Sequence, residues 1–244
     1  MKEKILVLVR AMPQESRKYG HTVCVAGIND KGEWRRLYPF QFKYGERKIS
    51  FRKKDMIAVE LDDPDNDKRK ESRKVKSHIN LNDQKTPEEV RKIIIPFITS
   101  LKELDDKKAS LGVVKPEILD FEVKVHNTEI MDDQKHLSLL AEGFMETREK
   151  VKLPIEARYI FKCSGKHECG CNKKPHKITL IDWELNELAR SIMKTEKDKK
   201  IIEQKIKDKF LTWMRTRDMY FFMGTQFRWQ TWLIIGIFYP AKIM

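Results

Sequence analysis

The residues best suited to chemistry lie between Phe161 and Trp183, a segment with three of the chain's four cysteines and two of its six histidines. The candidate ligands follow the spacing C-x3-H-x-C-x-C-x4-H: Cys163, His167, Cys169, Cys171 and His176. Structural zinc takes four thiolate or imidazole ligands in a tetrahedron, and nearby lysines favour the thiolate form of cysteine. The pattern predicts a Zn²⁺ site made of Cys163, Cys169, Cys171 and His176, with His167 as a substitute ligand.

Two other interpretations of this segment stay open. Cys169-x-Cys171 is tighter than the C-x2-C spacing of common zinc ribbons, so a surface loop or a labile disulfide also fits. A catalytic zinc keeps one coordination position open, whereas four or five protein ligands close the shell here. The nucleobase deaminase signature, H-x-E followed by P-C-x-x-C, is absent from the sequence. We therefore predict a structural metal that staples the two strands flanking the segment.

Other catalytic patterns are missing from the sequence. The chain has no P-loop, G-x-S-x-G, H-E-x-x-H or G-x-G-x-x-G motif. A metal-dependent nuclease remains an alternative, with acids drawn from Asp62, Asp63, Asp65, Asp182, Glu184 and Glu187. Charged residues make up 36% of the chain, so acid pairs are expected by chance. Asp182 is better suited to cap the helix expected after it.

The charge of the chain points to a polyanionic partner. Lysine and arginine number 50 against 37 aspartates and glutamates, which gives a formal net charge of +13. Each neutralised phosphate of a nucleic acid releases condensed counterions, so such an excess favours binding. The alternative is a lysine-rich protein whose charge serves only solubility.

Basic residues alternate with aromatic ones between Trp34 and Lys54, and a second basic stretch runs from Lys68 to Lys76. Cations interleaved with aromatic rings suit a groove that binds phosphates while bases stack on the rings. Because alternate residues of a strand face opposite sides, Trp34, Arg36 and Tyr38 should share one face. No base-reading motif is present, so we expect sequence-independent binding. The predicted nucleic-acid-binding residues are Trp34, Arg35, Arg36, Tyr38, Lys43, Arg47, Lys48, Arg52, Lys53, Lys54, Arg69 and Arg73.

Hydrophobic patterns predict an α+β protein in three parts. Residues 1–80 read as short strands joined by turns, which indicates a small β-barrel. Residues 81–152 form a connecting region with a strand and two helices, one opened by a capping box at Thr86 and divided at Pro96, the other over 136–150. Residues 153–244 hold the Cys/His segment, one or two amphipathic helices between Glu184 and Met214, and a C-terminal hairpin.

No segment of the sequence reads as a membrane or export signal. The apolar runs 5–9 and 232–240 are too short for a signal-peptide core and a membrane helix, respectively. Cys24 lies far from the other three cysteines, so the cysteines do not form a disulfide framework. We expect a cytoplasmic protein without a membrane partner.

The stretches ILVLVR, RKYGHTVCVAGINDKGEWRRLYPF, SLGVVKPEILDFEV and YFFMGTQFRWQTWLIIGIFYP, with the cysteine segment leading into IDWE, resemble an uncharacterised prokaryotic protein family. Its N-terminal part is similar to the dual OB-containing domain of bacterial and archaeal conflict (defence) systems. The resemblance implies an OB-like barrel at the N-terminus, with Trp34, Arg36 and Tyr38 on the matching stretch. It also implies a role beside a nucleic-acid-targeting defence effector.

Together these observations favour a non-catalytic nucleic-acid-binding module. The expected setting is an accessory subunit of a larger prokaryotic defence or nucleic-acid-processing complex, with DNA or RNA and a larger protein effector as partners. Two alternatives remain: the metal-dependent nuclease, and a protein-interaction subunit that docks an acidic partner through the helical segment 184–214.

Overall fold

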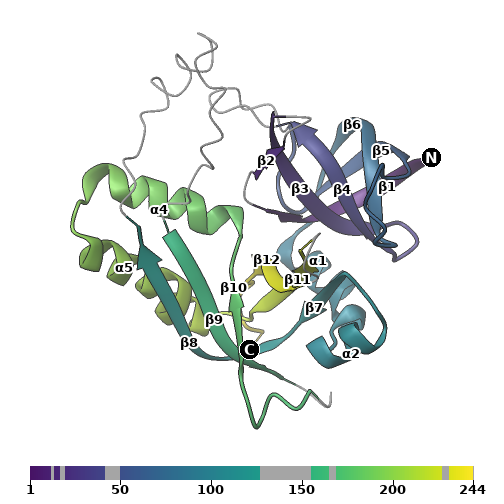
Figure 1. Ribbon diagram of the computed structural model, residues 1–244. Helices are drawn as coiled ribbons and strands as arrows, with labels where there is room; N and C mark the ends of the chain where they lie inside the picture. Colours follow the sequence, from purple (N-terminus) through teal and green to yellow (C-terminus); the bar gives the residue numbers. More distant parts are fainter. Residues whose placement is uncertain are drawn as a thin grey trace.

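The computed structural model describes residues 1–11, 14–16, 20–41, 50–126, 155–164, 169–226 and 231–243. It shows a mixed α+β fold in which an N-terminal barrel lies against a C-terminal part of two sheets and flanking helices (Figure 1). The second helix expected in the connecting region, over 136–150, lies outside the described residues. Among the helices that are described, none combines the length and the apolar character needed to cross a membrane.

A small closed barrel of five strands is present, as the sequence predicts, but the stretch 62–78, which reads as a surface loop, forms the fifth strand from Ser72 onward. The five strands are β1 (Lys2–Arg10), β3 (Gly20–Asn29), β4 (Trp34–Gln41), β5 (Asp55–Asp62) and β6 (Ser72–Gln84). The short strand β2 (Gln14–Ser16) extends the sheet beside β3. The pairing runs β1-β3-β4-β6-β5 and returns to β1, antiparallel except between β4 and β6. Alternate residues point inward, so Ile5, Val25, Leu37 and Ile57 fill the interior without any exposed surface.

Two short helices lead out of the barrel. The helix α1 (Pro87–Ile94) begins at the predicted capping box, in which Thr86 and Glu89 bond each other's backbone N–H groups. Pro96 lies in the 3₁₀ turn η1 (Ile95–Phe97), which confirms that the helix is divided there. The helix α2 (Leu101–Asp106) follows, with Ser100 as its N-cap.

The C-terminal part contains two three-stranded sheets. One has the order β10-β9-β8, from β8 (Pro116–Val125), β9 (Ile155–Cys163) and β10 (His176–Thr179). The other has the order β12-β11-β7, from β7 (Leu111–Val114), β11 (Tyr220–Thr225) and β12 (Trp232–Phe238). The predicted C-terminal hairpin is therefore present, with β7 added as a third strand. Strands from the expected connecting region, β7 and β8, belong to the same sheets as the last third of the chain.

The helical segment after residue 182 is divided rather than continuous. The helix α4 (Trp183–Thr195) ends before a second N-cap, Asp198, which opens α5 (Lys199–Lys207). A π-helix, η2 (Asp208–Trp213), and a 3₁₀ turn, η3 (Met214–Thr216), complete the segment. The apolar faces of α4 and α5 pack on the β8–β9 sheet around Phe121, Tyr159 and Phe161 (Figure 1). Of the one or two helices expected, the structure shows two.

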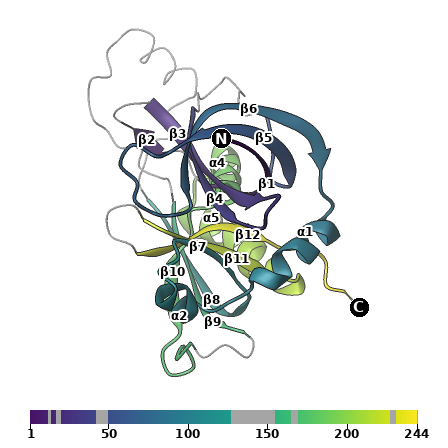
Figure 2. The ribbon, with the colours of Figure 1, turned by 90° about the vertical axis from the view of Figure 1, so that its right-hand side faces the viewer.

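The two parts share a core. The outer faces of β1 and β3 contribute Leu6, Leu8, Ala26 and Ile28, which pack against α1, β7, β11 and β12 (Figure 2). Trp34 of β4 joins them, with its ring edge-to-face to the rings of Phe97 and Phe222 at centroid distances of 6.3 and 6.1 Å. The C-terminal part therefore covers the first half of the outer face of β4.

Candidate functional site

The four predicted metal ligands come together at the end of the β9–β10 hairpin. Cys163 closes β9, Cys169 and Cys171 lie in the turn, and His176 opens β10, where it pairs with Phe161. Their ligand atoms all lie within 4.8 Å of one another. A tetrahedral zinc with bonds of about 2.3 Å to sulfur and about 2.0 Å to nitrogen separates its ligands by roughly 3.5–3.8 Å. The cluster can hold one metal ion, and three cysteines with one histidine are compatible with zinc.

The conformation of the hairpin turn brings the ligand atoms close together. Gly170 adopts a φ of +69°, a left-handed conformation that glycine takes without strain and that permits the tight Cys169-x-Cys171 spacing. Cys169 Sγ lies 3.1 Å from His176 Nε2, and the backbone N–H of Cys163 donates to Cys171 Sγ at 3.3 Å. Cys171 is buried, and Cys163 and Cys169 are half-buried. His167 and Glu168 lie outside the described residues.

The helix α2 supports the same cluster. Burial would raise the pKa of Cys169, but hydrogen bonds from the Lys102 backbone and from Cys163 and Cys171 hold that pKa below its ordinary value. Burial raises the pKa of Cys163 strongly, opposed by the backbone of Leu101. Burial lowers the pKa of His176, which favours the neutral imidazole that a metal needs. A metal here would join β9, β10 and the first turn of α2.

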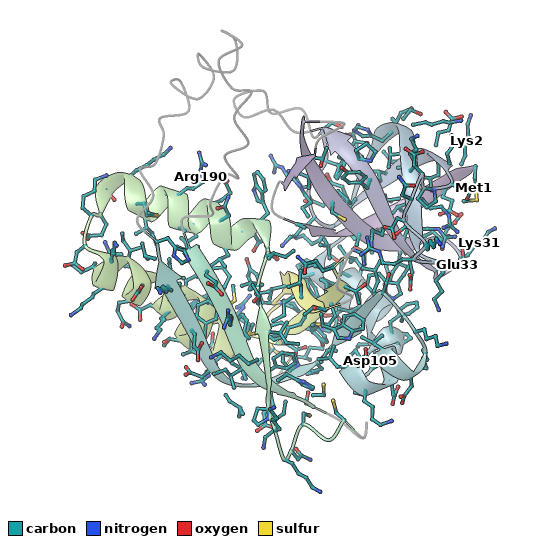
Figure 3. The ribbon with its side chains drawn as sticks, in the orientation of Figure 1. Met1, Lys2, Lys31, Glu33, Asp105 and Arg190 are labelled. Carbon is teal, nitrogen blue, oxygen red and sulfur yellow. The ribbon has the colours of Figure 1, made fainter. Side chains whose placement is uncertain are left out.

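The cationic residues of β4 are engaged within the protein. Arg35 donates to Glu3 at 2.8 Å and also pairs with Glu33, whose side chain lies in the turn before β4 (Figure 3). Arg36 is 5% exposed, and its guanidinium donates to the carbonyl of Ser110 at 2.7 Å. Burial lowers the pKa of Arg36. In this arrangement neither guanidinium faces a solvent-accessible groove.

Two further predicted cations also bond to the C-terminal part. Lys53 Nζ lies 2.8 Å from Asp182 and 2.9 Å from Glu184. Arg69 pairs with Asp67 and donates to the carbonyl of Thr225 at 2.5 Å. Together with Arg36, these side chains fasten the barrel to the C-terminal part.

The remaining predicted residues lie at the other end of β4 and along β6. Tyr38 is 37% exposed, and the parallel β4–β6 ladder pairs it with Lys74 and pairs Leu37 with Arg73. Arg52 is exposed and Lys54 half-buried in the turn before β5. Trp34 and Arg36 share the outer face of β4 with Tyr38, whereas Leu37 points into the barrel. Lys43, Arg47 and Lys48 lie outside the described residues.

The loop between β5 and β6 neutralises part of its own charge. Its acidic first half pairs with the basic second half through Asp62–Lys76, Asp65–Lys74 and Asp67–Arg69. Within the described ranges, Lys68, Lys70 and Arg73 take part in no ion pair, and residues 63–70 and 72–73 line an open pocket of about 370 Å³. Of the cations that line this pocket, these three remain available to an anion.

The acids of the nuclease alternative do not form an accessible metal site in the described part of the chain. Asp182 is 1% exposed and is the N-cap of α4, as expected: it accepts from the backbone N–H groups of Glu184 and Ile237, both at 2.7 Å. Burial raises the pKa of Asp182, opposed by Lys53. Burial alone would lower the pKa of Lys53, but the two carboxylates raise it. The oxygens of Asp182 are thus taken up by structural bonds.

Comparison with known proteins divides the chain close to Pro96. Residues 1–95 match a domain of unknown function (DUF8758), and residues 98–244 match another domain of unknown function (DUF8757). No curated protein matches the chain. The boundary separates the barrel and α1 from the two C-terminal sheets, one of which carries the Cys/His cluster. Because the second match spans more than half of its length, the chain belongs to the family of the domain of unknown function DUF8757.

Proposed function

We propose that the protein is a non-catalytic nucleic-acid-binding module whose barrel contacts the ligand and whose Cys/His cluster holds a structural zinc. The observation that carries the proposal is the β4–β6 pairing. It brings the exposed aromatic ring of Tyr38 beside the basic stretch 68–76, which is distant in sequence. An exposed ring beside unpaired cations suits base stacking next to a phosphate backbone.

The barrel supports this proposal through its topology. Leaving out the edge strand β2, the closed order first-second-third-fifth-fourth, with a parallel third–fifth pair, is that of an OB-like Greek-key barrel. OB barrels bind oligonucleotides across the second and third strands and the loops beside them. Here β7, β11 and β12 cover the first half of that face, and Tyr38 with the loop 63–71 forms the open half. We therefore leave Trp34, Arg35 and Arg36 out of the proposed contact surface.

We expect the proposed binding surface to bind nucleic acid without regard to base sequence. Lys68, Lys70 and Arg73 would contact phosphates, and Tyr38 would stack on a base regardless of sequence. Single strands suit this surface best because their bases are accessible for stacking. The role in a prokaryotic defence or nucleic-acid-processing complex rests on the sequence resemblance. A reducing cytoplasm suits the free thiols of the cluster.

The proposal predicts that the variant Lys68→Glu/Lys70→Glu binds nucleic acid more weakly than the wild type. Loss of two phosphate contacts should reduce the slope of log K against log salt by about 1.8 for a DNA duplex and about 1.4 for a single strand. Fluorescence anisotropy with labelled single- and double-stranded DNA and RNA measures both quantities. The matched control is Lys194→Glu/Lys200→Glu, which makes the same charge change at exposed helical positions away from the barrel. Equal losses in both variants would show that only net charge matters and would contradict the assigned surface.

A further inference from the structure

The π-helix η2 has an identifiable cause. The backbone N–H of Met214 bonds to the carbonyls of Lys209 and Leu211 and leaves out that of Phe210, its partner in an α-helix. The hydroxyl of Tyr159 donates to the Phe210 carbonyl at 2.5 Å, and the Tyr159 side chain is fully buried. Tyr159 thus takes the carbonyl that an α-helical turn would use. π-Helical turns occur frequently at functional sites.

A cation–aromatic cluster made of Lys209, Trp213, Arg217 and Tyr239 lies at the end of this turn. Lys209 Nζ lies 3.2 Å from the centroid of the Trp213 ring, and the Arg217 guanidinium carbon lies 5.2 Å from it. Tyr239 meets the same ring edge-to-face at 5.7 Å. Trp213 is 38% exposed, so the cluster is open to solvent. One ring therefore holds two cations in defined positions at the surface.

Lys209 and Arg217 do not form an ion pair with a described carboxylate. Nearby Lys53, Arg91 and Lys115 pair with carboxylates. Across the described ranges, no carboxylate oxygen lies within 4.0 Å of Lys209 or Arg217. Burial would raise the pKa of Glu184, but Lys53, Tyr239 and Lys209 hold that pKa below its ordinary value. The Glu184 carboxylate is already bonded by Lys53 at 2.9 Å and by the Tyr239 hydroxyl at 2.7 Å.

The cluster is also linked to the barrel. Tyr239 contacts Glu184, Glu184 contacts Lys53, and Lys53 lies in the barrel turn next to the exposed Arg52. A single-stranded nucleic acid that lies along the junction of the two parts would meet Arg52 on the barrel side and Lys209 and Arg217 on the other side. Two preorganised, unpaired cations are the arrangement that binds a phosphate group.

We propose that Lys209 and Arg217, held on Trp213, form a second phosphate-binding site for the backbone of a single-stranded nucleic acid. The proposal rests on the nucleic-acid-binding function proposed above and extends it from the barrel to the C-terminal part. Trp213 positions the two cations, and its fluorescence should change when they bind a phosphate group.

The test compares Lys209→Glu/Arg217→Glu with Lys199→Glu/Lys200→Glu, an equal charge change on exposed residues of α5. For a labelled single strand, we expect the first variant to lower the salt slope by about 1.4 and the control to leave it nearly unchanged. Equal slopes in wild type and first variant would overturn the second site while leaving the barrel surface intact. Absence of binding by the wild type would instead overturn the proposed function itself.

A second measurement keeps the proposal testable if the charge reversal destabilises the chain. Titration of the full chain with an unlabelled oligonucleotide should change its tryptophan emission, and Trp213→Phe should remove most of that change. Titration with inorganic phosphate alone should give a far smaller change, because an isolated anion lacks the adjoining contacts. An unaltered response in Trp213→Phe, or an equal response to inorganic phosphate, would contradict a site for the nucleic-acid backbone.

Discussion

Replacing Cys169 by serine is expected to abolish stoichiometric zinc binding and to lower the melting temperature of the protein by about 10 °C. Cys169 is one of the four candidate ligands, and a metal ion that binds only the folded state stabilises it by about 4 kcal/mol at a thousand times its Kd. Elemental analysis after gel filtration and thermal unfolding measure the two effects. Cys24→Ser is the matched control, because Cys24 lies on β3 and outside the cluster.

Treating the wild type with a chelator should lower its melting temperature by a similar amount, and added zinc should restore that temperature. The β9–β10 hairpin and the first turn of α2 should exchange their amide protons faster without metal, because the metal joins them. A wild-type chain that carries no more zinc than Cys169→Ser would show that the cluster is not a metal site.

Replacing Asp182 by asparagine is expected to cost about 3 kcal/mol of folding free energy, the lower end of the range for a broken buried ion pair. Asparagine keeps one accepting oxygen, but its amide nitrogen cannot accept, so the loss combines the charge opposite Lys53 with one backbone hydrogen bond, from Glu184 or from Ile237. Glu184 still faces Lys53, which keeps the loss from being larger. Urea unfolding of wild type, Asp182→Asn, Lys53→Met and the double variant gives the coupling between the two residues.

The exposed pair Asp62–Lys76 provides the control for that cycle. Its atoms are 2.8 Å apart, the same distance as in Lys53–Asp182, yet the side chains of Asp62 and Lys76 are 44% and 52% exposed. Solvent screening makes such a pair nearly neutral for stability. An Asp182→Asn variant that unfolds like Asp62→Asn would contradict the role of Lys53–Asp182 in fastening the two parts.

The Cys/His cluster and most of the barrel strands could be predicted from local sequence patterns. The four ligands lie within one hairpin, so their spacing already determines that they meet. Alternation of apolar residues in β5 likewise predicts a strand with one buried face. The capping box at Thr86 is local in the same sense, because its two bonds span only three residues.

Local sequence patterns could not predict which of the cations are exposed and which are bonded within the protein. Alternation places Arg36 and Tyr38 on one face of β4. Only the tertiary fold shows that Arg36 is buried against Ser110, whereas Tyr38 remains exposed. Lys53 meets Asp182 across 129 residues. The π-helix depends on Tyr159, 51 residues from the carbonyl that it binds. The cluster on Trp213 therefore has no signal in the sequence beyond a tryptophan near basic residues.

The central claim is that the protein binds nucleic acid through phosphate contacts. The most direct test is the affinity of the purified, zinc-loaded chain for a labelled single strand, measured by anisotropy over a series of salt concentrations. The claim predicts binding that weakens steeply with salt, with each phosphate contact adding roughly 0.7 to the slope for a single strand. Absence of binding at low salt, or an affinity that salt leaves unchanged, would contradict it.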